Sequence, residues 1–181
     1  MLQVGERAPA FRAKPVFGYE VAIPDSARKR PLVLVFVPAL ESSISRSGLA
    51  RLQERYADFD RLGVSVVAIS PSSLRATQDF APRYHVLFPL ISDESGEISS
   101  RFDVGRIGAG GVLSNINPAT IRGGVESLGL GFGLPNRGML QAAAECVVDV
   151  DGTIAYSRQS EDLWETVDID ALLEAVKSCL S

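Results

Sequence analysis

A continuous apolar run constrains the fold of this chain more than any other feature. Residues 31–37 read PLVLVFV, and Pro38 ends the run. An uninterrupted stretch of this length, rich in β-branched residues, is typical of a strand that is buried on both faces. Residues 64–69 (VSVVAI) have the same character. Such strands occur mainly in parallel sheets with helices on both sides, so the two runs predict an α/β fold.

The segment between the two runs has the period of a helix. Within residues 45–62, the apolar side chains follow one another at steps of three, four and three, whereas charged residues take the opposite face. This spacing predicts one amphipathic helix, with Gly63 as its C-terminal cap. A strand–helix–strand order favours parallel pairing of the two strands. The apolar positions are Leu49, Leu52, Tyr56 and Phe59.

The rest of the chain continues this order up to a glycine-rich segment. Ten of the sixteen glycines lie in residues 105–138, which we interpret as an insertion. After it, Asp151-Gly152 between two apolar runs indicates a hairpin. The chain thus predicts one domain, residues 1–181, with a mixed sheet flanked by helices. The remaining expected elements are an N-terminal hairpin (16–23), helices from Ser72 or Ser73 to about 84, at 97–102 and after Asp168, and strands at 88–91, 145–150 and 153–157.

Composition and charge exclude several classes of function. The net charge of −4 is unsuited to nucleic acid, because phosphate binding needs a basic face. No apolar run approaches the roughly 20 residues that cross a bilayer, so we expect no membrane span. The single histidine, His85, and two cysteines, Cys146 and Cys179, lack the spacing of metal ligands, and we expect no metal and no cofactor.

The start of the chain and its cysteine content bear on the cellular compartment. The first residues, MLQVGERAPAF, contain no basic segment followed by an apolar one, so they predict no secretory signal. Two cysteines do not make a disulfide framework, and they suit a reducing compartment. We therefore expect the cytoplasm.

The loop after the first buried strand is the expected reactive place, because it leads into the start of a helix. Residues 36–46 read FVPALESSISR. This loop resembles the peroxiredoxin signature, in which proline ends a strand, threonine or serine follows four residues later, and the peroxidatic cysteine comes three residues after that. Pro38 and Ser42 fit the pattern. The cysteine position holds Ser45.

The resemblance covers most of the chain apart from residues 105–138. Residues 4–11 (VGERAPAF), 63–70, 84–93 and 147–154 (VVDVDGTI) are similar to further motifs of the alkyl hydroperoxide reductase/thiol-specific antioxidant (AhpC/TSA) family. The resemblance implies a thioredoxin-like fold, a peroxide substrate, a thiol reductant and, since related proteins often dimerise, a homodimer. In the divergent branch that this chain resembles most, a CxxC pair often occupies the positions of Ser42 and Ser45.

Two departures from the family pattern bear on activity. A peroxidase needs a thiolate whose pKa is lowered by its surroundings, and a serine hydroxyl cannot pass through sulfenic acid and disulfide states. Ala143 falls where the family usually has an arginine that holds the thiolate and the peroxide. Arg46, Arg122 and Arg137 are other candidate sources of positive charge.

The sequence leaves three interpretations of the loop open. In the first, the protein is a thiol peroxidase in which Ser45 has been introduced in place of cysteine, so that it is inactive as written. In the second, it is a natural pseudo-peroxidase that binds or regulates. The intact loop and Pro38 favour the first, and the missing arginine favours the second. In the third and plainest, Ser42 and Ser45 serve only as helix caps.

Overall fold

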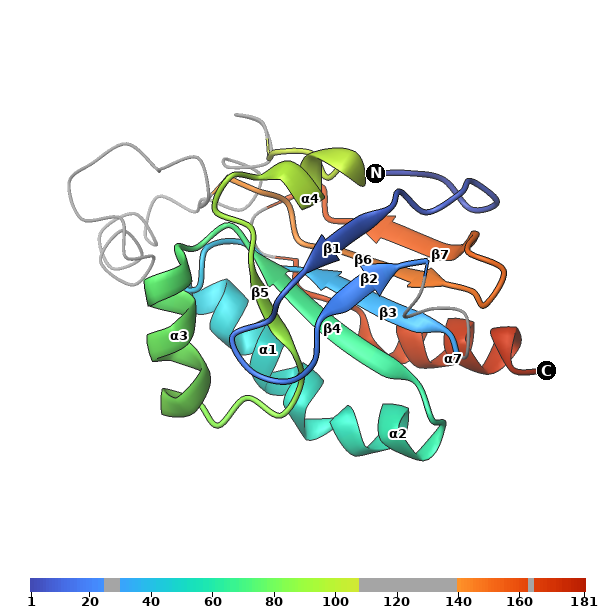
Figure 1. Cartoon of the computed structure of the whole chain (residues 1–181), viewed down its shortest axis with the longest axis horizontal. Helices are drawn as coiled ribbons and strands as arrows, with labels where there is room; N and C mark the ends of the chain where they lie inside the picture. Colours follow the sequence, from blue (N-terminus) through green and yellow to red (C-terminus); the bar gives the residue numbers. More distant parts are fainter. Residues whose placement is uncertain (25–29, 108–139, 163–164) are drawn as a thin grey trace, which may run out of the picture.

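The computed structural model describes residues 1–24, 30–107, 140–162 and 165–181. Within these ranges, the central sheet has five strands in the order β5-β4-β3-β6-β7 (Figure 1). The first three strands are parallel, whereas β6 runs antiparallel to β3, and β7 antiparallel to β6. The predicted mixed sheet is therefore confirmed. The strands are β3 (Leu32–Phe36), β4 (Ser65–Ser70), β5 (Leu90–Ser92), β6 (Ala144–Val148) and β7 (Ile154–Gln159).

The central strand β3 is buried at every residue, as its uninterrupted apolar sequence predicts. It pairs with β4 on one side and β6 on the other, so that Phe36 lies opposite both Ile69 and Ala144. Its side chains alternate between two hydrophobic cores, one on each face of the sheet. The chain leaves the sheet directly after Phe36, and this position fixes where the following loop stands.

Helices cover one face of the sheet, and a hairpin with one short helix covers the other (Figure 1). The first face carries α1 (Ser43–Glu54), α2 (Tyr56–Arg61), α3 (Leu74–Arg83) and α7 (Ile169–Cys179). The second carries β1 (Phe11–Ala13), β2 (Val21–Ile23) and α4 (Glu97–Arg101). No helix in the described ranges is long and apolar enough to cross a membrane.

Two predicted elements differ from the structure. The N-terminal hairpin was expected at 16–23, but its first strand lies earlier, at Phe11–Ala13, where the ring of Phe11 packs edge-on against Phe102. Residues 14–20 connect the strands, because Pro15 has no N–H to donate and Gly18 takes a positive φ of 88°. Most of the glycine-rich segment, 108–139, lies outside the described residues.

The helix predicted over 45–62 is two helices. The backbone leaves helical geometry at Arg55 (φ −102°, ψ 3°), which ends α1 and begins α2. The Arg55 guanidinium bonds Asp58 of α2 at 2.6 Å and Asp170 of α7 at 2.8 Å. The apolar positions remain on one face across this break, since Leu49, Leu52 and Phe59 are all buried in the same core. Periodicity reports which face is buried and does not detect a single residue that bends the axis.

Candidate active site

Pro38, Ser42 and Ser45 lie together where β3 ends and α1 begins. Pro38 follows Val37, whose N–H donates to the carbonyl of Ile69 in β4 at 2.9 Å. Ser42 is the N-cap of α1, and its hydroxyl accepts a hydrogen bond from the Ile44 N–H at 3.2 Å. Ser45 is the third helical residue. The prediction that Ser45 occupies the first turn of a helix after the Pro38 loop is confirmed.

The side chain of Ser45 faces the sheet and is sealed from solvent. Only 1% of the residue is exposed, and it shares a helical face with Leu49 and Leu52. Its hydroxyl has no hydrogen-bond partner among the described residues. Burying a hydroxyl without a partner costs about 1–3 kcal/mol. Burial of a cysteine at this position would cost less free energy, because a thiol is only a weak donor and is readily buried among apolar groups.

This contrast between the two serines gives a paired stability prediction. Ser45→Ala removes an unsatisfied hydroxyl and should raise the free energy of unfolding by about 1 kcal/mol. Ser42→Ala removes the cap of α1 and should lower it by about 1 kcal/mol. Urea unfolding of both variants beside the unchanged chain measures the two shifts. Destabilisation of similar size in both would mean that Ser45 also serves as a cap.

Serines from the neighbouring strand hold the loop in place. The Ser70 hydroxyl donates to the Pro38 carbonyl at 3.1 Å, and the Ser72 hydroxyl accepts from the Leu40 N–H at 2.9 Å. The Gln141 amide donates to the Val37 carbonyl at 3.2 Å. Sequence analysis missed all three residues as parts of the site. Their signal is indirect: Ser70 ends the parallel strand next to β3 and Ser72 follows it, so both arrive at the same edge of the sheet.

The start of β6 lies beneath the start of α1. β6 runs antiparallel to β3, and alternate residues of β6 face α1, since Val147 lies in the same core as Leu49. Gly48 lies one turn after Ser45 and packs close to Thr166, because a Cβ on Gly48 would lie 3.8 Å from the Thr166 Cβ. By the same register, Ala143 lies toward the Ser45 end. It carries only a methyl group, so position 143 supplies no positive charge.

The charge that the structure does place on this face is a buried carboxylate. Glu145 is fully buried and forms an ion pair of 3.0 Å with Arg158 of β7. One carboxylate oxygen also accepts from the Asp168 N–H at 3.2 Å, and the other has no partner within the described ranges. Burial raises the pKa of Glu145, and the Arg158 guanidinium opposes that rise.

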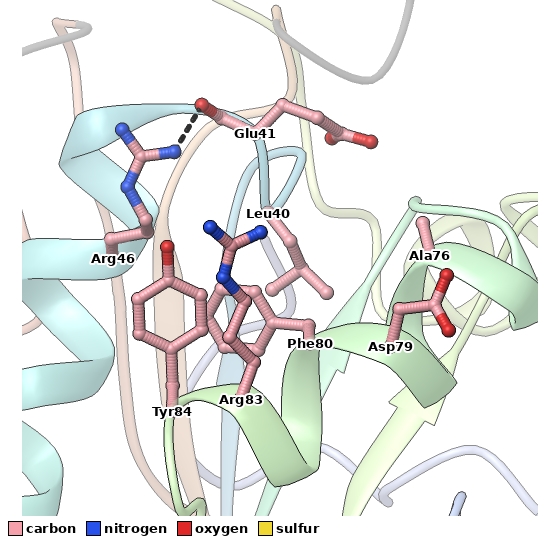
Figure 2. Close-up of a pocket in the computed structure, with 8 residues that line it drawn as sticks. All are labelled: Leu40, Glu41, Arg46, Ala76, Asp79, Phe80, Arg83 and Tyr84. Atoms are coloured by element: carbon pink, nitrogen blue, oxygen red, sulfur yellow. Dashed lines mark hydrogen bonds between the residues drawn. The ribbon is translucent and has the colours of Figure 1, made fainter.

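The one candidate arginine that the structure describes, Arg46, does not supply the missing charge. Arg46 follows Ser45 in α1, but its guanidinium donates to the Glu41 carbonyl at 2.7 Å and lines a cavity beside α3, of which Ser45 is not a lining residue (Figure 2). Arg122 and Arg137 lie outside the described residues. Of the candidates that the structure places, Arg46 is therefore directed elsewhere.

Both cysteines are free, and neither lies at this site. Cys146 is fully buried on the opposite face of the sheet, in the core of Phe36 and Phe102, where burial and the Glu145 carboxylate strongly raise the pKa of its thiol. Cys179 is the last residue of α7, and burial raises the pKa of its thiol as well. A thiol with a raised pKa is poorly ionised at neutral pH and is a weak nucleophile. No cluster of metal-ligating side chains occurs in the part of the chain that the structure places.

The burial of Cys146 predicts its reactivity. In a Cys179→Ser variant, Cys146 is the one remaining thiol of the chain, and it should resist a thiol reagent in the native state and react fully after denaturation. Titration with and without guanidinium chloride measures both. Rapid native labelling of that variant would contradict the placement of Cys146 in the core.

Comparison with known proteins shows the family of the chain. The model of the AhpC/TSA family matches residues 4–157. Chloroplastic peroxiredoxin Q of Sedum lineare is 29% identical over 100 residues, which are 55% of this chain and 53% of that protein, so the chain spans about half of this relative's length. The crystal structure of peroxidoxin BcpB from Mycobacterium tuberculosis superposes with a TM-score of 0.72 at 20% identity, over 98% of both chains. A cysteine-to-serine mutant of peroxiredoxin 6 from Arenicola marina gives 0.70 at 18% identity, over 99% of this chain and 74% of that one.

Proposed function

The chain belongs to the AhpC/TSA family, and we propose that it has the thiol-peroxidase fold without peroxidase turnover, because Ser45 stands at the position of the peroxidatic cysteine. In the family's reaction, a thiolate sulfur attacks one oxygen of a peroxide. A sulfur–oxygen bond forms, the oxygen–oxygen bond breaks, and water or an alcohol leaves. A thiol reductant then returns the sulfenic acid to the thiol. An alcohol with the high pKa of serine does not supply this nucleophile.

One observation carries the proposal: the residue at the start of α1 is a sealed serine, and no cysteine of the chain lies nearby to replace it. Cys146 faces the other core and Cys179 ends α7. The helix start that would stabilise a thiolate therefore has no sulfur beside it.

The direct test is consumption of hydrogen peroxide or an organic hydroperoxide by the unchanged chain with dithiothreitol. We expect a rate equal to that of dithiothreitol with the heat-denatured chain. A saturable rate above this background would defeat the proposal and would place the reactive group elsewhere.

Two observations bear on the origin of the serine at residue 45, and they favour different origins. The unpartnered Ser45 hydroxyl suits a cavity formed around a thiol, which is what an introduced serine would leave. Ala143 suits a natural pseudo-peroxidase that binds or regulates, because its methyl group gives a thiolate no positive charge to stabilise it. The codon for residue 45 in the gene separates them, since a cysteine codon means replacement and a serine codon means a natural loss.

The setting of the protein is also part of the proposal. Unpaired Cys146 and Cys179 suit the reducing cytoplasm, and we place the protein there. A peroxide and a thiol reductant would be its partners only with cysteine at residue 45. We propose a homodimer as its assembly, which sedimentation at several protein concentrations tests.

A further inference from the structure

A cavity of about 210 Å³ lies between the loop that leads into α1 and the outer face of α3 (Figure 2). Its apolar wall consists of Leu40 and the stacked rings of Phe80 and Tyr84, whose centroids are 4.3 Å apart. Ser45 does not line it. The cavity is therefore separate from the position of the peroxidatic residue, although both use the same loop.

The charged groups of this cavity do not neutralise one another. Arg46 and Arg83 line it, and so do Glu41 and Asp79, yet no ion pair joins any two of these four among the described residues. Arg46 is held in place by its bond to the Glu41 carbonyl, which leaves most of its N–H groups available. The Glu41 carboxylate accepts a hydrogen bond from the Ser72 hydroxyl at 3.2 Å, and this bond helps to fix its direction.

The positively and the negatively charged groups lie on different sides of the cavity. Figure 2 shows the guanidinium groups of Arg46 and Arg83 on the side of the Tyr84 hydroxyl, whereas the carboxylates of Glu41 and Asp79 lie toward the start of α3. The Arg83 guanidinium carbon is 5.9 Å from the centre of the Tyr84 ring, within the range of a cation–π contact. Figure 2 shows the rings of Phe80 and Tyr84 on the side of the guanidinium groups. A net-negative ligand would be repelled by the two carboxylates, and a net-positive ligand by the two guanidiniums.

We propose that this cavity binds a small zwitterion, an amino acid or dipeptide with free ends and an apolar side chain. Its carboxylate would bond Arg46 and Arg83, its ammonium group would face Glu41 and Asp79, and its side chain would lie on Phe80 and Tyr84. Guanidinium–carboxylate bonds are among the stronger polar contacts in proteins, and an aromatic wall contributes apolar burial. The inference goes beyond the missing peroxidase reaction and does not depend on Ser45.

Binding of the dipeptide phenylalanyl-glycine, followed by ¹⁵N–¹H NMR of the full chain without peroxide, tests the proposal. We expect saturable shifts of the Arg83 and Tyr84 amides with a Kd of about 1 mM, a typical affinity for a weak small ligand. The N-acetylated dipeptide, which lacks the ammonium group, and the C-terminal amide, which lacks the carboxylate, should each bind about tenfold more weakly. Equal affinity for all three, or no saturable shift up to about 10 mM, would overturn the proposal.

Variants give a second readout with a matched control. Arg83→Gln and Asp79→Asn each remove one exposed charge of the cavity and should weaken the free dipeptide about tenfold, with an otherwise unchanged spectrum. Arg75→Gln removes an exposed charge of α3 that does not line the cavity, and should leave the Kd unchanged. Unchanged affinity of both cavity variants for the dipeptide would also overturn the proposal that it binds in this cavity. Peroxidase turnover is not measured, so this outcome is independent of the proposed function.

Discussion

Ser45→Cys should give the chain a slow peroxidase activity. The substitution replaces an oxygen by a sulfur in a buried position at the start of α1, where the helix favours a thiolate. With dithiothreitol in excess, we expect peroxide consumption at least about tenfold above the unchanged chain, since a thiol is a far better nucleophile than an alcohol. The rate should remain below that of a peroxiredoxin with an arginine at position 143.

A further variant locates the reason for that low rate. In Ser45→Cys with Ala143→Arg, the added guanidinium would supply the positive charge that position 143 lacks and should raise the rate by about 10²-fold, the usual effect of one positioned group on a developing charge. Ala143→Arg alone should remain inactive. If the folded Ser45→Cys protein consumes no more peroxide than the unchanged chain, the pocket itself has lost the reaction, and the binding alternative becomes the account of the site.

Arg158→Met should be among the most destabilising single changes in this protein. It leaves the Glu145 carboxylate buried without its ion-pair partner. Breaking a buried pair on one side costs about 3–5 kcal/mol, and we expect about 3 kcal/mol because Arg158 itself is 31% exposed. Arg61→Met is the matched control, since its exposed pair with Asp58 should contribute less than about 1 kcal/mol. Equal losses of unfolding free energy in the two variants would contradict the role assigned to Glu145.

Glu145 should also give the stability of the fold a pH dependence of known sign. Burial raises its pKa in the native state above the ordinary value of 4.5, so the native state binds the proton more tightly than the unfolded state. The free energy of unfolding should therefore fall as pH rises from about 4.5 through the native pKa, and then stay level. Comparison of the unchanged chain with Glu145→Gln by urea unfolding between about pH 4 and 8 isolates this fall. Parallel curves for the two proteins would mean that Glu145 does not titrate in this way.

Much of the fold follows from local sequence patterns. The apolar runs that become β3 and β4, the helical face of Leu49 and Leu52, and the Asp168 cap of α7 are each set by the residues themselves, and the structure has them where the patterns predict. The break at Arg55 could not be predicted, because the ion pair of Arg55 with Asp170 reaches α7, which lies far along the chain. The first strand of the hairpin was missed because Phe11 finds its partner, Phe102, only in the folded protein.

The candidate site was also predictable only in part, because several of its contacts form only in the folded protein. The placement of Pro38, Ser42 and Ser45 follows from the order of strand, loop and helix. The hydrogen bonds of Ser70, Ser72 and Gln141 to the loop arise from neighbouring strands, so no local pattern predicts them. The burial of Glu145 is the clearest case. A glutamate in an apolar run carries no sign that its partner is an arginine thirteen residues later on the next strand.

The measurement that tests the central claim most directly is trapping of sulfenic acid on the unchanged chain. The protein is treated with hydrogen peroxide in the presence of dimedone, a reagent specific for sulfenic acid, and analysed by mass spectrometry beside Ser45→Cys. We expect one dimedone adduct, at residue 45, in Ser45→Cys. We expect none in the unchanged chain, where Cys146 and Cys179 both have raised thiol pKa values. A stoichiometric adduct on Cys146 or Cys179 of the native, unchanged chain would contradict it.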